Sequence, residues 1–327
     1  MPPLLDVQNL TTVFHTSSHG VLTAVDDVSF SINAGQSLGV VGESGCGKSV
    51  TALSIMRLVP SPPGEITAGK IFFDGTDLLT LSEKEMQKVR GNNISMIFQE
   101  PMTSLNPVFK IGEQIGEVLR LHEGLGKKAA LERAIDLLHQ VGIPSPAQRA
   151  KEFPHQLSGG MRQRVVIAMA LACSPRLIIA DEPTTALDVT IQGQILDLMH
   201  SLAETTGTAL LLVTHDLGVV AENTDDVVVM YSGRVVEKAS TVNLFDKPLH
   251  PYTQGLMQSI PIIPEKGTPI HKGTLDTIPG VVAPLYAQPT GCRFRERCKY
   301  AFAKCEKIEP PLLKPEAGRE VRCWLYE

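Results

Sequence analysis

A glycine-rich loop restricts the folds open to this chain more than any other feature of its sequence. The loop is Gly42–Ser49, which reads Gly-Glu-Ser-Gly-Cys-Gly-Lys-Ser and follows the apolar stretch Leu38–Val41. In a strand–loop–helix unit of this pattern, backbone N–H groups surround phosphate oxygens and the helix N-terminus attracts negative charge. Lys48 would reach the β- and γ-phosphates of a nucleotide, and the Ser49 hydroxyl would help to hold Mg²⁺. The alternative is an ordinary glycine-rich turn between a strand and a helix.

Two later stretches make the prediction more specific than general nucleotide binding. One is Leu157–Arg164, which reads Leu-Ser-Gly-Gly-Met-Arg-Gln-Arg, and the other is Leu177–Glu182, which reads Leu-Ile-Ile-Ala-Asp-Glu. By itself, the first stretch is also typical of a helix N-terminus with Ser158 as the N-cap. Together with the phosphate loop, and in this order, the two stretches resemble the ATP-binding-cassette (ABC) ATPases. Their LSGGQ-type signature is matched here with Met161 in place of glutamine.

The apolar patterns predict an α/β fold. Short apolar runs without polar alternation, at 177–180 and 209–214, are typical of strands buried on both faces. Apolar residues at i, i+3 and i+4 predict helices at 111–122 and 127–141. Further strands are expected at 4–14, 28–41, 70–73, 94–98, 227–231 and 234–238, and a helix at 48–58. The resemblance implies an ABC-type nucleotide-binding domain with a RecA-like core, an antiparallel β subdomain and a helical insertion.

The character of the sequence changes after Asp246, where prolines become frequent and long apolar helices stop. We therefore expect an ABC ATPase domain at residues 1–258, with a helical subdomain at about 101–157. A small cysteine-rich C-terminal module is expected at residues 259–327.

Composition and charge argue against some functions. The net charge is −5, and no block of lysine and arginine indicates nucleic-acid binding. The first residues lack the basic and apolar regions typical of a signal peptide. The longest uncharged apolar run, Val165–Cys173, is much shorter than the roughly 20 residues that span a bilayer. Any role at a membrane is therefore expected to come through a partner.

Asp181 and Glu182 end a predicted buried strand. There, Asp181 can bind Mg²⁺ and Glu182 can polarise an attacking water, although two adjacent acids also suit a solvated turn. The resemblance implies two further residues: His215 as a switch histidine near the γ-phosphate, and Gln99 as the Q-loop glutamine. We predict Glu182, His215 and Gln99 as catalytic residues, and Ser49, Gln99 and Asp181 as Mg²⁺ ligands.

The resemblance also implies a dimer that buries ATP between two chains, because the signature and the phosphate loop of one chain cannot both reach one γ-phosphate. Ser158 and the backbone of Gly159 and Gly160 would donate hydrogen bonds to the partner's ATP. Phe14 matches the position of an aromatic residue that stacks on adenine; a core phenylalanine is the alternative. The residues expected to bind the nucleotide are Phe14, Gly42, Glu43, Ser44, Gly45, Cys46, Gly47, Lys48, Ser49, Val50, Asp181, Ser158, Gly159 and Gly160.

Three segments narrow the resemblance to the ATPases of oligopeptide, dipeptide and nickel importers. They are Pro101–Pro107, Leu249–Pro261 and Lys48–Met56, and the last is similar to the D-type subunit. The likeness implies pairing with a paralogous F-type ATPase or with itself, on two transmembrane permease subunits fed by a periplasmic substrate-binding protein. Residues 102–108 and the following helices would receive a coupling helix of the membrane subunit, or simply pack within the domain. The expected location is the cytoplasmic face of the inner membrane.

The function expected from this likeness is ATP-driven import of dipeptides or oligopeptides. Import of nickel or another small solute, and a redox-sensing regulatory ATPase, are the alternatives, because none of the residues quoted above touches the transported substrate.

Four of the six cysteines lie near the C-terminus with the spacing C-x5-C-x6-C-x17-C: Cys292, Cys298, Cys305 and Cys323. Cytosolic chains seldom need disulfides, so metal ligation is a natural reading. The close cysteine pairs of a zinc site are absent, which favours an iron–sulfur cluster, and zinc or plain thiols stay open. D-type subunits carry a similar tail, and the likeness implies a 4Fe–4S cluster. Cys46 is expected to be a small loop residue and Cys173 a core residue.

Overall fold

The computed structural model describes residues 2–99, 104–184, 188–259 and 277–327. The chain forms two compact units, each assembled from segments that are distant in the sequence. Unit 1 contains Met1–Asp6, Ser31–Ser37 and Ile71–Val213, and unit 2 contains Val7–Phe30, Leu38–Lys70 and Thr214–Glu327. The predicted boundary near residue 258 stays a prediction.

Unit 1 is built on parallel strands that the sequence predicts closely. β6 (Ile94–Ile97) pairs with β7 (Leu177–Asp181), which pairs in parallel with β8 (Ala209–Thr214). Every residue of β7 and β8 is buried, as expected of apolar strands covered on both faces. Because parallel strands end at the same edge of a sheet, residues that follow β6, β7 and β8 are brought toward one edge.

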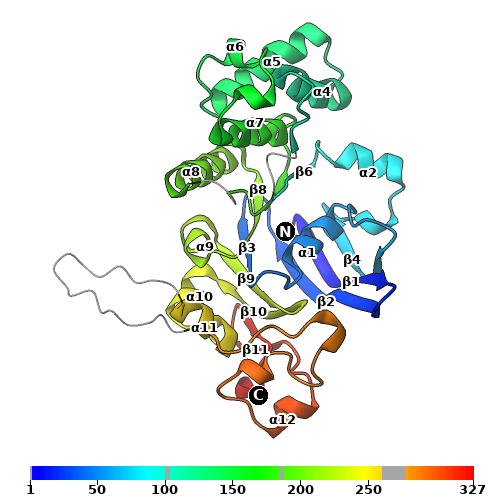
Figure 1. Ribbon diagram of the computed structural model, residues 1–327, viewed down its shortest axis with the longest axis vertical. Helices are drawn as coiled ribbons and strands as arrows, with labels where there is room; N and C mark the ends of the chain where they lie inside the picture. Colours follow the sequence, from blue (N-terminus) through cyan, green and yellow to red (C-terminus); the bar gives the residue numbers. More distant parts are fainter. Residues whose placement is uncertain (1, 100–103, 185–187, 260–276) are drawn as a thin grey trace, which may run out of the picture. The chain divides into compact units, whose positions relative to one another are not determined.

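Two helices of unit 1 match the helices predicted at 111–122 and 127–141. α4 (Ile111–Glu123) and α5 (Lys127–Gln140) pack side by side, followed by α6 (Pro146–Arg149) and α7 (Gly159–Leu171), which lies beneath them in Figure 1. α2 (Glu83–Val89) precedes them, and α8 (Val189–Thr206) follows β7. The apolar spacing works as predicted, since α4 buries Ile111, Ile115 and Leu119.

Two short stretches of the chain differ from the predicted strands and helix. The strand predicted at 28–41 is two strands, because residues 33–36 form a turn in which the N–H of Gln36 donates to the carbonyl of Asn33 at 3.2 Å. The helix predicted at 48–58 is α1 (Lys48–Ile55), which ends three residues early.

A four-stranded sheet has the order β2–β1–β4–β5. It is made of β1 (Leu5–Thr16), β2 (Gly20–Ile32), β4 (Gly64–Phe73) and β5 (Thr76–Asp77).

The main strands of unit 2 continue into the C-terminal tail. β3 (Ser37–Val41) pairs in parallel with β9 (Asp226–Tyr231), which forms the predicted hairpin with β10 (Arg234–Ser240). β10 then pairs antiparallel with β12 (Arg319–Val321), and β12 with β11 (Leu313–Glu316). The helices of this unit, besides α1, are α9 (Leu217–Asn223), α10 (Thr241–Asp246), α11 (Pro251–Gln258) and α12 (Ala303–Lys307).

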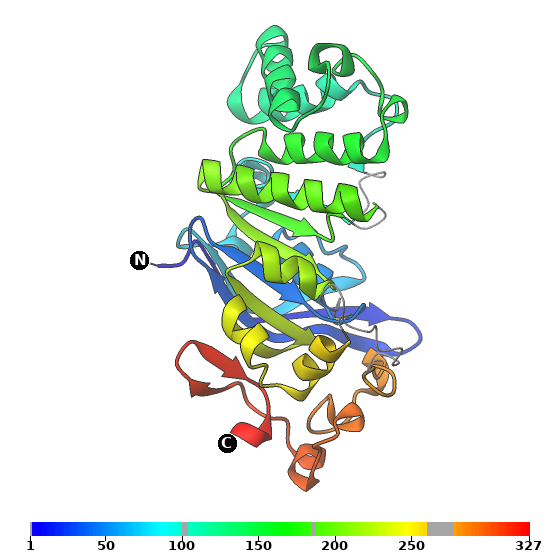
Figure 2. The ribbon, with the colours of Figure 1, turned by 90° about the vertical axis from the view of Figure 1, so that its left-hand side faces the viewer.

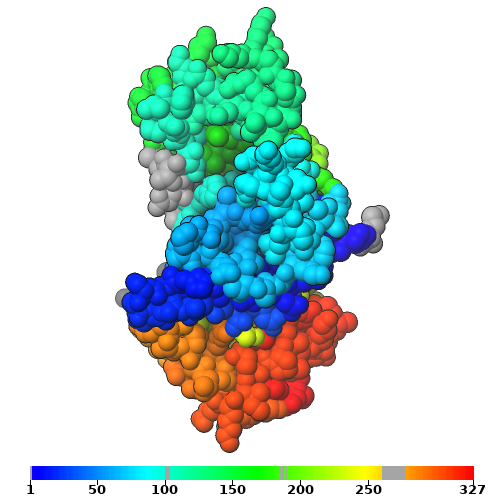
Figure 3. Space-filling view, turned by 90° about the vertical axis from the view of Figure 1, so that its right-hand side faces the viewer, coloured from blue at the N-terminus to red at the C-terminus, as the bar shows by residue number. Residues whose placement is uncertain are grey.

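The C-terminal residues share the core of unit 2 rather than packing only among themselves. Phe294 is 3% exposed and packs with Tyr231 and Tyr252, which belong to β9 and α11. Figure 2 shows the red β11–β12 hairpin to the left of the yellow helices α10 and α11. Figure 3 shows orange and red C-terminal residues against dark-blue N-terminal residues. No helix in the described part of the chain is long and apolar enough to cross a bilayer.

Candidate active site

The loop Gly42–Ser49 has the predicted strand–loop–helix geometry, and two glycines are required by its close packing. Gly42 follows β3 with φ 152°, and a Cβ there would lie 2.2 Å from the carbonyl oxygen of Met230. Gly47 caps α1 with φ 103°, and a Cβ there would lie 2.5 Å from the carbonyl oxygen of Ala24. Any side chain at these positions would displace the loop, which holds its N–H groups at the start of a helix.

The Lys48 side chain folds back onto the start of the phosphate loop. Its side chain is buried, and Nζ donates to the carbonyl oxygens of Gly42 at 2.7 Å and Glu43 at 3.1 Å. Ser49 and Val50 are half-buried in the first turn of α1. An ammonium group held by neutral carbonyls can exchange them for phosphate oxygens, which carry charge and make stronger hydrogen bonds.

The cysteines outside the tail are unsuited to reactive roles. Cys46 is 2% exposed, and burial raises the pKa of its thiol, so it fills the loop as predicted and is shielded from reagents. Cys173 is half-buried rather than fully in the core, and burial raises its pKa to about 11.

In unit 1 the structure brings two of the predicted catalytic residues together. Asp181 is the buried last residue of β7, and Glu182 follows it with φ 46°, a conformation that residues other than glycine rarely adopt. The Glu182 N–H donates to the carbonyl of Val213 at 2.8 Å, which fixes this turn. The Gln99 side-chain Nε2 donates to Glu182 Oε2 at 3.0 Å. The neutral amide of Gln99, two residues after the end of β6, therefore orients the Glu182 carboxylate.

The signature stretch begins α7, as its capping pattern predicts. Ser158 is the N-cap, and its Oγ accepts from the N–H of Met161 at 3.3 Å, while Gly159 and Gly160 form the first turn. A further polar contact comes from Gln163, which is fully buried and donates through Nε2 to the carbonyl of Pro183 at 2.6 Å. This bond ties the signature helix to the residue after Glu182. Its neighbours Arg162 and Arg164 are charged, so the local sequence gives no signal that Gln163 is buried.

The remaining predicted nucleotide contacts lie in unit 2 with the phosphate loop. Phe14 is a half-buried residue of β1, so it is not a fully buried core phenylalanine. His215 is exposed directly after β8, and Asp216 caps α9 by accepting from the N–H of Gly218 at 2.8 Å. Residues 100–103 and 185–187, which include part of the Pro101–Pro107 segment, lie outside the described residues.

Sequence reasoning missed two residues of unit 2 that hold the phosphate loop. The Tyr252 hydroxyl accepts from the backbone N–H of Glu43 at 2.8 Å. The Arg297 guanidinium contacts both carboxylate oxygens of Glu43, at 2.7 and 3.0 Å. Spacing along the chain gives no signal for either contact, because Tyr252 and Arg297 lie more than 200 residues from Glu43.

The four C-terminal cysteines line one small pocket, together with His250, Phe294 and Trp324. Burial raises the pKa of Cys292 to about 12 and of Cys323 to about 11, and it also raises the pKa of Cys298. Among the described residues, no group of three or more His, Cys, Asp or Glu side chains is placed to hold a metal ion. The predicted 4Fe–4S cluster is therefore not confirmed, and the raised pKa values keep the Cys292, Cys298 and Cys323 thiols protonated at neutral pH.

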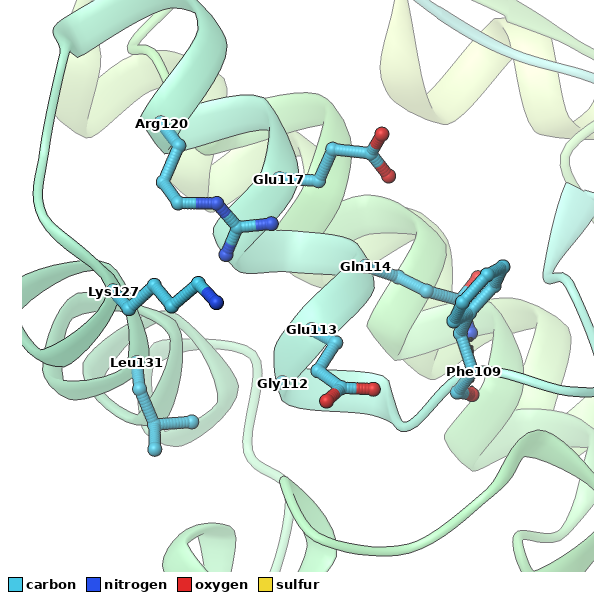
Figure 4. A pocket seen from close by; sticks show the side chains of 8 residues that line it. All are labelled: Phe109, Gly112, Glu113, Gln114, Glu117, Arg120, Lys127 and Leu131. Atoms are coloured by element: carbon cyan, nitrogen blue, oxygen red, sulfur yellow. Dashed lines mark hydrogen bonds between the residues drawn. The ribbon is translucent and has the colours of Figure 1, made fainter.

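Unit 1 also has a pocket on the helical insertion, between α4 and α5. Figure 4 shows the charged ends of Arg120 and Lys127 reaching into the same space. Phe109, which is 51% exposed, lies at the other side. The lining is Phe109, Gly112, Glu113, Gln114, Glu117, Arg120, Lys127 and Leu131.

Comparison with known proteins agrees with this geometry. Residues 25–185 match the family described as ABC transporter, and residues 236–305 match the oligopeptide/dipeptide transporter C-terminal region. The chain is 54% identical to the oligopeptide transport ATP-binding protein AppD of Bacillus subtilis, over all of this chain and 98% of the relative. It belongs to the ATP-binding proteins of oligopeptide/dipeptide ABC transporters. As such it is an ATP-hydrolysing transporter subunit.

This ABC ATPase is also similar to a second curated relative and to a solved structure. It is 47% identical to the dipeptide transport ATP-binding protein DppD of Bacillus subtilis, over all of this chain and 96% of the relative. It is also similar to a dimeric, post-hydrolysis structure of the ATP-binding cassette MJ0796 bound to ADP and Pi, with a TM-score of 0.65 and 28% identity. That match covers 72% of this chain and 98% of the solved one, which supports the ABC-type nucleotide-binding fold.

Proposed function

We propose that this chain hydrolyses ATP to drive peptide import by an ABC transporter. The observation that carries the proposal is the 3.0 Å contact between Gln99 and Glu182, because it orients a carboxylate at the end of a buried strand. A carboxylate held in this way is suited to polarise an attacking water. Several relatives are named as oligopeptide or dipeptide transport proteins, which favours a peptide over nickel as the transported solute.

The proposed roles follow from the chemistry of each group. The N–H groups of Gly42–Ser49 and the Lys48 ammonium bind the phosphates of ATP, and Phe14 stacks on the adenine. Ser49, Gln99 and Asp181 would hold Mg²⁺, whose positive charge would offset the charge of the phosphates. Glu182 accepts the proton of the attacking water, and His215 contacts the γ-phosphate.

The proposed active form is a dimer. Ser158, Gly159 and Gly160 lie at the N-terminus of α7, where free N–H groups suit an anion, and they would complete the partner's ATP site. The solved MJ0796 structures are described as dimeric, which supports this arrangement. The second ATPase is either another copy of this chain or a paralogous F-type subunit.

Glu182→Gln tests the proposed chemistry. We expect the turnover of ATP to fall by about 100-fold or more, because the amide cannot accept a proton. ATP should still bind with nearly wild-type affinity and should trap the dimer, as measured by fluorescence titration and size-exclusion chromatography. Glu204→Gln on the exposed face of α8 is the matched control. Near-normal turnover of Glu182→Gln would contradict the role given to Glu182.

The proposed partners are two transmembrane permease subunits and a periplasmic binding protein, with this chain on the cytoplasmic face of the inner membrane. The surface around Phe109 and the pocket between α4 and α5 is the proposed docking site for the permease, because it combines exposed apolar and charged groups. No nucleic acid is expected among the partners.

We also propose that the tail is a cysteine-rich module in which Cys292, Cys298, Cys305 and Cys323 hold a 4Fe–4S cluster. Its support is that all four thiols line one pocket. The raised pKa values mean that the thiols must lose protons when a metal binds. When bound, the cluster would cross-link residues that have little regular structure.

Protein purified without oxygen tests this part of the proposal through its iron, sulfide and zinc content. We expect about four irons and four sulfides per chain, which Cys298→Ser should remove. Zinc in their place, or protein free of metal, would rule out the cluster and leave the ATPase proposal intact.

A further inference from the structure

Glu43 is the acidic residue of the phosphate loop, and its side chain is paired with a residue from the C-terminal tail. Arg297 ends the short 3-10 helix Arg295–Arg297 and makes two hydrogen bonds to the Glu43 carboxylate, at 2.7 and 3.0 Å. The Arg297 side chain is only 6% exposed, and its Nε donates to the carbonyl of Pro279 at 3.0 Å. A bidentate pair of this kind is strong and fixes direction as well as distance.

The same loop residue is also held through its backbone. The hydroxyl of Tyr252, a fully buried residue of α11, accepts from the Glu43 N–H at 2.8 Å. Tyr252 in turn packs against Tyr231 and Phe294, which lie next to the Arg297 guanidinium. Both the backbone and the side chain of Glu43 are therefore fixed by one packed group of residues.

The middle of the loop is braced from the same tail. The N–H of Gly233 donates to the carbonyl of Cys46 at 2.9 Å. The hairpin turn that contains Gly233 is held by Arg293, whose side chain donates to the carbonyl of Ser232 at 2.5 Å, and by Gln288, which bonds the Ser232 hydroxyl at 2.8 Å. Residues 288–297 therefore support the loop at two separate points.

We propose that Arg297 is a positioning residue for ATP binding, which acts by holding the Glu43 carboxylate away from the triphosphate and neutralising its charge. The inference rests on the proposed role of Gly42–Ser49 as the phosphate site. An unpaired Glu43 carboxylate within this loop would repel the phosphates, whereas the carboxylate paired with Arg297 does not. Because Arg297 does not contact the reacting atoms, its loss should weaken ATP binding more than it slows hydrolysis.

The test compares KM and kcat for ATP hydrolysis, and the Kd of a fluorescent ATP analogue, in the full-length protein. We expect Arg297→Met to raise KM and Kd by about tenfold and to leave kcat within about twofold. Arg297→Lys, which keeps the charge without the bidentate geometry, should fall between Arg297→Met and wild type. The double variant Arg297→Met/Glu43→Gln should recover most of the lost affinity, because the repelling charge is gone.

Arg295→Met is the matched control. Arg295 lies in the same 3-10 helix, but its side chain bonds the backbone of Thr290 and Glu306 and not the loop. It should bind ATP with wild-type affinity. Equal losses in Arg295→Met and Arg297→Met, or a double variant as weak as Arg297→Met, would overturn the proposal, because both would indicate a general loss of packing.

Two further variants keep the outcome decisive. If Arg297→Met fails to fold, the smaller change Arg297→Gln carries the same expectations, and wild-type KM in either variant overturns the proposal. Lys48→Ala tests the phosphate site itself. ATP binding that survives Lys48→Ala would refute the proposed function and this inference together, whereas loss in Lys48→Ala without loss in the Arg297 variants would refute only the inference.

Discussion

At the scale of single residues, His250 shows how burial sets a charge state. His250 is 1% exposed, and its Nδ1 accepts from the N–H of Tyr252 at 3.0 Å, so the imidazole is neutral. Its own N–H and that of Leu249 donate to the buried Glu237 carboxylate, both at 2.8 Å. Burial lowers the pKa of His250 from 6.5 to about 3. The fold therefore depends on this side chain staying unprotonated.

The stability of the protein should decrease in acid because of His250. Between pH 6.5 and 3 the unfolded chain binds a proton here that the folded chain does not, so stability is present above 6.5 and is lost as pH falls. From pH 7 to 5 we expect a loss of about 2 kcal/mol from this residue. The His250→Asn variant can still cap α11. Between pH 7 and pH 5 its free energy of unfolding should fall by about 2 kcal/mol less than that of the wild type, as measured by urea unfolding at both pH values. His139→Asn on the exposed face of α5 should keep the wild-type dependence; the same slope in His250→Asn would contradict the prediction.

At the scale of elements, the start of α7 combines a structural and a proposed catalytic role in one residue. Ser158 caps the helix through Oγ, and the same hydroxyl is proposed to reach the partner's ATP. The cap satisfies an N–H that has no partner within the helix. Substitutions at this position can therefore separate helix stability from activity.

Ser158→Ala should lower the free energy of unfolding by about 1 kcal/mol and also impair hydrolysis, because it removes both hydrogen bonds. Ser158→Asn should keep the stability, since asparagine is an equally good N-cap, but should still impair hydrolysis. Thermal unfolding and ATPase rates measured on both variants test this separation. Wild-type activity in Ser158→Asn would show that the hydroxyl contributes only as a cap.

At the scale of the whole molecule, unit 2 depends on residues that are more than 200 positions apart in the sequence. Asp26 of β2 accepts hydrogen bonds from Arg234 of β10 and from Arg293 of the tail. The Phe294 ring lies 5.2 Å from that of Tyr231, nearly perpendicular to it. The tail is thus part of the core that positions the phosphate loop.

Phe294→Ala should destabilise unit 2 by about 3–5 kcal/mol, because it leaves a cavity between buried aromatic rings. Phe302→Ala, at a side chain that is 43% exposed, should cost less than about 1 kcal/mol. Denaturant unfolding followed by tyrosine fluorescence compares the two. Similar small effects would mean that the tail does not contribute to the core.

Much of the fold and of the candidate site can be predicted because it is encoded in short segments. The Gly42–Ser49 loop, the buried strands β7 and β8, and the cap at Ser158 each depend on neighbours within a few residues, so spacing and polarity suffice. The break between β2 and β3 was missed because residues 33–36 separate two apolar stretches that read as one strand.

Other features depend on contacts between distant segments, and only the tertiary structure decided them. The hydrogen bond from Gln99 to Glu182 joins residues that follow different strands, and the pairs Glu43–Arg297 and Glu43–Tyr252 span more than 200 residues. The neutral state of His250 depends on burial by residues from several elements. The sequence determined the local chemistry of each motif, because backbone conformation and capping are short-range. The folded chain determined which charges meet and which side chains lose water, because both depend on packing among distant segments.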